Sequence, residues 1–88
     1  MYFVYILQSI KDNYFYTGFA KNLKTRVNKH NKGEVTATKK RLPLKLVYFE
    51  GSLNKSDTLK RETYLKTAWG KRYIKNRLRN YIKEKEKK

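Results

Sequence analysis

Few side chains in this sequence of 88 residues could carry out chemistry. The absence of cysteine excludes disulfide frameworks, thiolate zinc sites and cysteine nucleophiles, and the single histidine, His30, excludes a histidine-rich metal site. Only seven acidic side chains stand against 23 lysines and arginines. Any catalysis must therefore rely on tyrosine, lysine, arginine, His30 and a few carboxylates.

Glu62 is the one carboxylate that the sequence places in the body of a predicted helix, three residues after Leu59 and on the same face. Mg²⁺ often takes one or two protein carboxylates and completes its shell with water and substrate phosphate, so Glu62 is a candidate metal ligand. The alternative is an i,i+4 salt bridge to Lys66 on a solvated face, worth a few tenths of a kcal/mol.

Arg26 and His30 lie one helical turn apart in another predicted helix and flank Val27, at the edge of its apolar face. An arginine can hold phosphate oxygens in a fork, and a histidine can pass a proton or orient a water. The alternatives are that Arg26 is one of many solvated cations on this helix, and that His30 only complements the helix C-terminus.

Tyr5 and Tyr16 belong to two predicted strands of a hairpin. A two-residue turn at Asp12-Asn13 pairs Ser9 with Tyr16 and puts both tyrosines on one face, whereas a turn one residue longer moves Tyr16 to the other face. Tyrosine can serve in acid–base catalysis only if surrounding cations lower its pKa, which is about 10 when unperturbed. The alternative is that the tyrosines simply fill the core and rim of a small sheet.

The hydrophobic pattern predicts the elements that must position these side chains. Strands are expected over residues 2–8, 14–19 and 45–50, and Gly18 marks a bulge or a close backbone approach within the second. A helix is expected from an N-cap at Asn22 to Asn31, ended by Gly33, and residues 34–45 are predicted to form a loop.

The second half of the chain is predicted to be helical. One helix should begin after an N-cap at Ser56 or Asn54 and end at Gly70, and a last helix should begin at Lys71. That helix buries the apolar positions Ile74, Leu78, Tyr81 and Ile82. We expect one α/β (α+β) domain over residues 1–82, in the order ββαβαα with a three-stranded sheet, and a charged, frayed tail over residues 83–88.

The formal net charge of +16 is spread over both halves of the chain, and it points to a polyphosphate partner. No apolar run is long enough to span a membrane, and no signal peptide precedes Met1. The composition therefore predicts a cytoplasmic protein that binds nucleic acid and does not enter membranes.

Together these residues have a familiar spacing. Val4-Tyr5-Ile6, Tyr16-Thr17-Gly18, the helical segment from Asn22 to Asn31 and the distant Glu62 resemble the GIY-YIG nuclease superfamily over about residues 2–80. The first triplet stands where the family has GIY, and the second where it has YIG. The chain is most similar to the small stand-alone bacterial members, often described as excinuclease-subunit-like.

The resemblance implies phosphodiester hydrolysis with one Mg²⁺ or Mn²⁺ and a small mixed or antiparallel three-stranded sheet flanked by helices. By position, Glu62 would bind the metal and Arg26 would steady the scissile phosphate. Tyr5 and Tyr16 would line the site, one as general base or orienting the water, with His30 in their hydrogen-bond network.

The chain departs from the family pattern at two positions. Val4 replaces the first glycine of GIY, and Phe19 stands where the repair incision subunit has a lysine, for which Lys21 could substitute. Contacts to nucleic-acid phosphates are expected from a set of basic residues: Lys21, Lys39, Lys40, Arg41, Arg72 and Lys75.

The leading hypothesis is a DNA endonuclease, structure-selective or weakly sequence-selective, with a role in DNA repair or recombination. We expect DNA in preference to RNA, a monomer or weak dimer, and a protein partner for targeting, since the separate targeting domain of the larger family enzymes is absent. The alternatives are a non-catalytic nucleic-acid-binding module that retains the nuclease fold, and a ribosome-associated basic protein.

Overall fold

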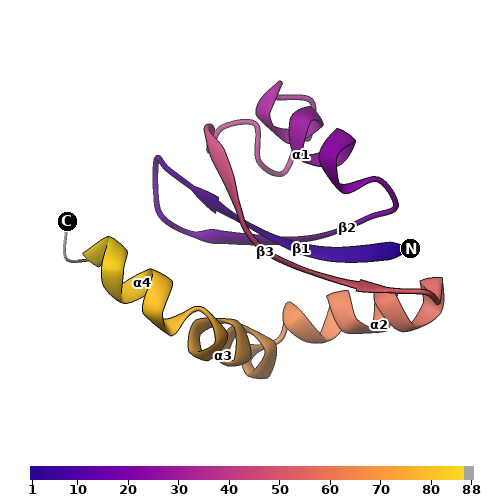
Figure 1. Ribbon diagram of the computed structural model, residues 1–88. Helices are drawn as coiled ribbons and strands as arrows, with labels where there is room; N and C mark the ends of the chain where they lie inside the picture. The colour runs from indigo at the N-terminus through magenta and orange to yellow at the C-terminus, as the bar shows by residue number, and fades with distance from the viewer. Residues whose placement is uncertain (87–88) are drawn as a thin grey trace.

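Three antiparallel strands form one sheet in the order β2-β1-β3, which confirms the expected α+β fold with a three-stranded sheet (Figure 1). The computed structural model describes residues 1–86. Its elements in chain order are β1 (Tyr2–Ser9), β2 (Phe15–Ala20), α1 (Leu23–Asn31), β3 (Leu44–Ser52), α2 (Lys55–Leu65), α3 (Ala68–Arg77) and α4 (Arg79–Glu86).

Strand β1 lies at the centre of the sheet, and its side chains supply both cores. One cluster gathers Val4 and Ile6 with Leu65, Ile74 and Leu78, and the other gathers Tyr5 and Leu7 with Ala20 and Leu44. Helix α1 covers the Tyr5 face, while α2, α3 and α4 lie along the opposite face (Figure 1). The alternation along β1 therefore assigns Tyr5 to the side of the sheet that α1 covers.

The register of the β1–β2 hairpin differs from the expected one by two residues. Tyr5 lies opposite Gly18, and Leu7 lies opposite Tyr16. The turn is longer than two residues, because the Ser9 amide donates to the Tyr14 carbonyl and Asn13 adopts a positive φ of 64°. An even shift keeps each side chain on its face, so the expectation that Tyr5 and Tyr16 share a face is confirmed.

The first helix begins and ends as the sequence predicts. The Asn22 side chain accepts a hydrogen bond from the Thr25 amide at 3.0 Å, and Gly33 follows the helix with a φ of 75°. For α2 the structure selects Asn54 over Ser56 as the N-cap, since the Asn54 side chain accepts from the Asp57 amide at 3.0 Å. Strand β3 is longer than expected at both ends.

The prediction that Gly70 ends a helix is wrong. Gly70 lies in the first turn of α3, which begins at Ala68 after an N-cap at Thr67. A side chain at Gly70 would overlap the Tyr64 carbonyl and the Leu65 backbone at the end of α2. This glycine therefore allows two helices to pack end against end rather than breaking one.

The predicted last helix is divided at Leu78 into α3 and α4. Leu78 and Ile74 are nevertheless buried, with Tyr81 and Ile82 packed against them, so the predicted apolar face is confirmed. Helix α4 runs to Glu86, and Lys85 Nζ donates to Gln8 Oε1 at 3.1 Å, so the frayed tail expected from residue 83 does not begin there. The rest of that predicted tail, residues 87–88, lies outside the described residues.

The close approach at Gly70 leads to a stability prediction. We expect Gly70→Ala to lower the free energy of unfolding by about 1–3 kcal/mol, because the added methyl group would force α2 and α3 apart. Urea unfolding followed by circular dichroism would measure the change. Gly51→Ala is the control, since its added carbon would meet mainly the flexible Met1 side chain. A Gly70→Ala protein as stable as the wild type would contradict this packing.

Candidate active site

A chain of buried hydrogen bonds joins strand β1, helix α1 and the loop that follows it. The Tyr5 hydroxyl lies 2.7 Å from His30 Nε2, and His30 Nδ1 lies 2.7 Å from Thr38 Oγ1. All three side chains are inaccessible to solvent. A neutral imidazole has one donor and one acceptor, and each hydroxyl can play either part, so both ring nitrogens are satisfied.

His30 is held in its neutral form. Burial lowers its pKa from 6.5 to about 4, and the positive charge of Arg26 acts in the same direction. The ring of Tyr16 packs edge-on against the imidazole, with centroids 5.2 Å apart. At neutral pH His30 therefore acts as a fixed hydrogen-bonding group and not as a cation.

Gly18 makes the position of Tyr5 possible. A side chain at Gly18 would overlap the end of the Tyr5 ring and its hydroxyl, so the ring crosses over bare backbone to reach His30. The close approach predicted for this glycine is confirmed. The glycine of the triplet Tyr16-Thr17-Gly18 leaves room for the Tyr5 ring. Tyr16 lies beside the same ring at a centroid distance of 6.5 Å.

Arg26 reaches the cluster from the preceding turn of α1. Its Nε donates to the Tyr5 hydroxyl at 3.4 Å. Within residues 1–86 its two terminal nitrogens make no hydrogen bond, and the side chain borders an open hollow of about 360 Å³ that Lys21 and Lys29 also line. Lys21 and Arg26 thus line the same hollow, and the substitution of Lys21 for the lysine missing at Phe19 stays a prediction.

The condition for acid–base catalysis by a tyrosine, a pKa lowered by surrounding cations, is not met at Tyr5. Burial raises its pKa above 10, and this outweighs the lowering by the hydrogen bond and charge of Arg26. The negative charges of Tyr16, when ionised, and of Glu62 raise it further. Tyr5 is thus a protonated hydroxyl at neutral pH, suited to orient a ligand and not to accept a proton.

Glu62 approaches this cluster from α2 without a hydrogen bond to it in the described chain. The carboxylate is close enough for its charge to raise the Tyr5 pKa, and its side chain is 18% exposed. Oε2 lies 3.2 Å from Lys66 Nζ, so the i,i+4 salt bridge that the spacing suggested is also present.

The donor set around Glu62 limits which metal it could hold. Residues 1–86 contain no group of three or more His, Asp or Glu side chains that could enclose an ion. A single carboxylate fits Mg²⁺ or Mn²⁺, since such ions can complete their shell with water and phosphate oxygens. It does not fit an ion that requires a cage of protein ligands.

The other predicted nucleic-acid contacts are dispersed. Lys39 and Lys40 are exposed in the loop before β3, while Arg41 is paired with Asp12 at 3.1 Å. The Arg72 guanidinium lies over the Trp69 ring at 5.0 Å. Of this set, only Lys21 lines the hollow that Arg26 borders.

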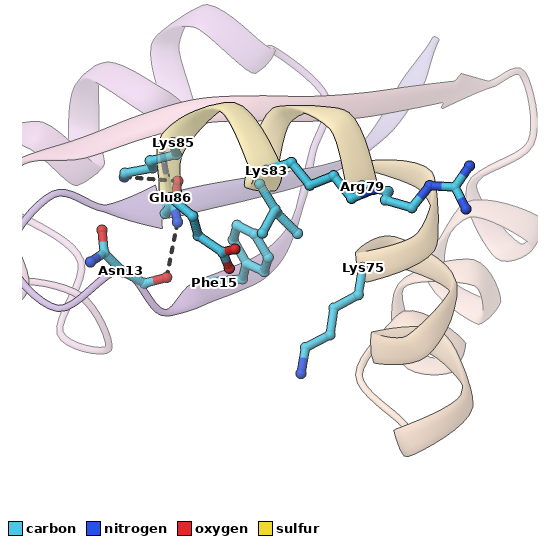
Figure 2. Close-up of a pocket in the computed structure, with 9 residues that line it drawn as sticks. Asn13, Phe15, Lys75, Arg79, Lys83, Lys85 and Glu86 are labelled. Carbon is cyan, nitrogen blue, oxygen red and sulfur yellow. Dashed lines mark hydrogen bonds between the residues drawn. The ribbon is translucent and has the colours of Figure 1, made fainter. Parts of the chain in front are cut away.

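A cavity lies on the opposite face of the sheet, between the hairpin and helices α3 and α4 (Figure 2). It measures about 650 Å³, and Lys75, Arg79 and Lys83 line it beside Phe15. None of Tyr5, Tyr16, Arg26, His30 and Glu62 lines it. We place the candidate active site at the tyrosine cluster, because the convergent polar groups are there.

Sequence reasoning missed two residues that build the site. The Thr38 hydroxyl completes the hydrogen bonds of His30. Thr38 lies in a loop with no periodic hydrophobic pattern, so only the structure identifies it. The Asn31 side chain bonds both the amide and the carbonyl of Leu44, at 2.8 and 2.9 Å. These bonds fix the end of α1 against β3.

Buried, neutral His30 should make the protein sensitive to mild acid. The unfolded chain binds a proton at this residue near pH 6.5 and the folded chain only near pH 4, so stability falls as the pH drops through that window. We expect a loss of about 2 kcal/mol between pH 7 and pH 5. The single histidine gives one imidazole signal in an NMR titration. A midpoint near pH 6.5 would contradict the burial.

Replacing Thr38 by valine keeps the shape of the side chain and removes the partner of His30 Nδ1. We expect Thr38→Val to cost about 1–3 kcal/mol of unfolding free energy, since a buried polar atom is left unsatisfied. Thr36→Val is the matched control, because Thr36 is exposed in the same loop. Equal stability of the two variants in urea unfolding would show that the bond to Thr38 contributes nothing.

Comparison with known proteins matches this chain to one family model and to a set of relatives. The family model of the GIY-YIG catalytic domain matches residues 1–77. UPF0213 proteins of Staphylococcus aureus strains Mu3, Mu50 and COL are 43% identical to this chain over 84 residues, which is 94% of this chain and 95% of each relative. No solved structure matches the chain.

The matched residues 1–77 include all three strands and the helices α1, α2 and α3. They carry Tyr5, Tyr16, Arg26, His30 and Glu62. The chain therefore belongs to the GIY-YIG family, a superfamily of nucleases.

Proposed function

We propose that the protein is a metal-dependent endonuclease that hydrolyses phosphodiester bonds in DNA with structural or weak sequence selectivity. The observation that carries this proposal is the meeting of Tyr5, Tyr16, Arg26 and His30 on one face of the sheet. They come from β1, β2 and α1, and packing alone does not require a buried histidine bonded to two hydroxyls. In a phosphate site, this buried network would hold Arg26 in position.

Arg26 would bind the scissile phosphate. Its Nε is occupied by Tyr5, and this fixes the plane of the guanidinium and directs its terminal nitrogens to the hollow shared with Lys21. In this position Arg26 would offset the negative charge that develops on the phosphate oxygens in the transition state.

Tyr5 would hold Arg26 through its buried hydroxyl, and its partner His30 would not accept the proton. Protonating a group of pKa about 4 at pH 7 costs about 4 kcal/mol, so the imidazole is a poor proton acceptor. The hydrogen-bonded row of Tyr5, His30 and Thr38 instead holds the Tyr5 hydroxyl in place. The general-base role then falls to Tyr16, which is more exposed.

Glu62 would hold a single Mg²⁺ or Mn²⁺. A divalent cation supplies Lewis-acid activation and offsets charge on the phosphate. For binding to occur, Glu62 must release Lys66, and a half-buried carboxylate in a chain of net charge +16 can exchange one cation for another.

The positive net charge of the chain indicates the class of substrate. Excess positive charge over both halves of the chain favours a nucleic-acid backbone as the partner and predicts binding that weakens steeply with salt. We propose DNA over RNA, a role in repair or recombination, and a protein partner for targeting. None of the helices described here is long and apolar enough to cross a membrane.

A second candidate is a non-catalytic nucleic-acid-binding module with the same fold. The ion pair between Glu62 and Lys66 favours it, since it occupies the candidate metal ligand, and so does the raised pKa of Tyr5. In that case the wild type binds DNA but cleaves none, and Glu62→Gln leaves the DNA affinity unchanged.

Two substitutions separate these candidates. Glu62→Gln and Arg26→Ala should each lower the cleavage rate by about 10²-fold or more, because each removes a group that acts on the transition state. DNA affinity should change little, since Arg26 is one of 23 basic residues. The assay uses branched, nicked and single-stranded DNA with Mg²⁺ or Mn²⁺.

Matched controls are available on the same helices. Asp57→Asn on α2 and Lys24→Ala on α1 alter exposed charges and should leave cleavage within a few-fold of the wild type. Failure of the wild type to cleave any substrate in the panel with either metal would overturn the nuclease proposal.

A further inference from the structure

The only tryptophan of the chain is exposed. Trp69 lies in the first turn of α3 and keeps 67% of its surface in contact with solvent, although it is one of the largest apolar side chains available to a small core. Neither hydrophobic cluster includes it. Its large ring therefore presents a free aromatic face outside the fold.

Trp69 belongs to a row of aromatic rings and guanidinium groups on α2 and α3. The Arg72 guanidinium lies 5.0 Å from the Trp69 ring centroid, and the Arg61 guanidinium lies 4.7 Å from Tyr73 and 5.5 Å from Tyr64. We call this set of residues the stacking surface: Arg61, Tyr64, Trp69, Arg72 and Tyr73.

The stacking surface is held in position by the fold. Glu50 on β3 binds Arg61 through two contacts, Oε1 to Nε at 2.6 Å and Oε2 to Nη2 at 3.3 Å. Tyr48 also donates to Glu50 Oε2, at 2.9 Å. Arg61 is thus fixed between two aromatic rings, which orders the surface before any ligand arrives.

The charge of this region indicates its ligand. Helix α3 contains four lysines and arginines and no acidic residue, and the one carboxylate that contacts the stacking surface, Glu50, is neutralised by Arg61. A second copy of this chain, also at +16, would be repelled. A polyanion whose units carry flat aromatic faces fits both features, and nucleic acid with unpaired bases is such a ligand.

We propose that the stacking surface binds unpaired bases of DNA, with Trp69 as the central platform. This rests on the proposed function and narrows its substrate to DNA with a single-stranded segment, since paired bases do not offer their faces. Glu62 and Tyr64 both belong to α2 but, two residues apart, they lie on different faces of the helix, so a strand held here would have to pass around α2 to reach the candidate metal ligand. Cleavage is then directed to the neighbourhood of a junction between paired and unpaired DNA.

Tryptophan fluorescence tests the proposal directly, because Trp69 is the only tryptophan of the chain and all tryptophan emission comes from it. The wild-type chain is titrated with oligothymidine and with a blunt duplex of equal length, in EDTA so that nothing is cleaved. Labelled DNA confirms that each ligand is bound. We expect quenching by the single strand at saturation and little change with the duplex.

Variants give the matching affinities. Trp69→Ala should weaken single-strand binding about 5- to 150-fold and duplex binding much less, while Trp69→Phe should retain most of the affinity. The control is Tyr14→Ala, which removes an aromatic side chain that is 73% exposed on the hairpin and does not belong to the stacking surface. That variant should bind both ligands as the wild type does.

Three results would overturn the proposal. One is unchanged fluorescence at saturation, another is an equal effect of Trp69→Ala on both DNA forms, and the third is concentration-dependent self-association that Trp69→Ala abolishes. Because binding is measured without metal, a protein that cleaves nothing can still pass this test. A true nuclease can likewise fail it, so the two proposals are judged separately.

Discussion

The candidate site depends on the passage of the Tyr5 side chain over Gly18. Only a residue without a β-carbon on β2 lets the ring reach His30 and bond it at 2.7 Å. That contact sets the distance between the sheet and α1, and Arg26, one turn earlier on the same helix, then meets the Tyr5 hydroxyl. The packing of one face of the sheet thereby determines the position of Arg26, the residue proposed to bind the phosphate.

Helix α1 is short, so its placement requires contacts at both ends. Asn22 caps its start, and the two hydrogen bonds from Asn31 to Leu44 fasten its end to β3. Thr38 then closes the last bond of His30 from the following loop. A polar histidine can be buried here because both of its nitrogens are satisfied, and its low pKa follows from the same burial.

Local signals in the sequence were sufficient for the strands and the first helix, whereas the candidate site residues were singled out by the resemblance to a family. The pattern failed where a distant contact decides the local structure. Gly70 looks like a helix end in the sequence, but it is a contact between two helices, and the register of the hairpin depends on a turn whose length no periodicity fixes. The raised pKa of Tyr5 could not be predicted from the sequence either. Composition shows the cations that lower the pKa, but not the burial that raises it by more.

We propose that the positive charge is divided between two roles, in which a diffuse positive surface would hold the nucleic acid and Arg26 with Glu62 would act on one phosphate. A crystal structure with Mn²⁺ and uncleaved DNA tests this most directly. We expect Mn²⁺ to bind Glu62 in place of Lys66, and a phosphate to bind the terminal nitrogens of Arg26 next to the Tyr5 hydroxyl. Glu62 still paired with Lys66, and the backbone bound elsewhere, would contradict it.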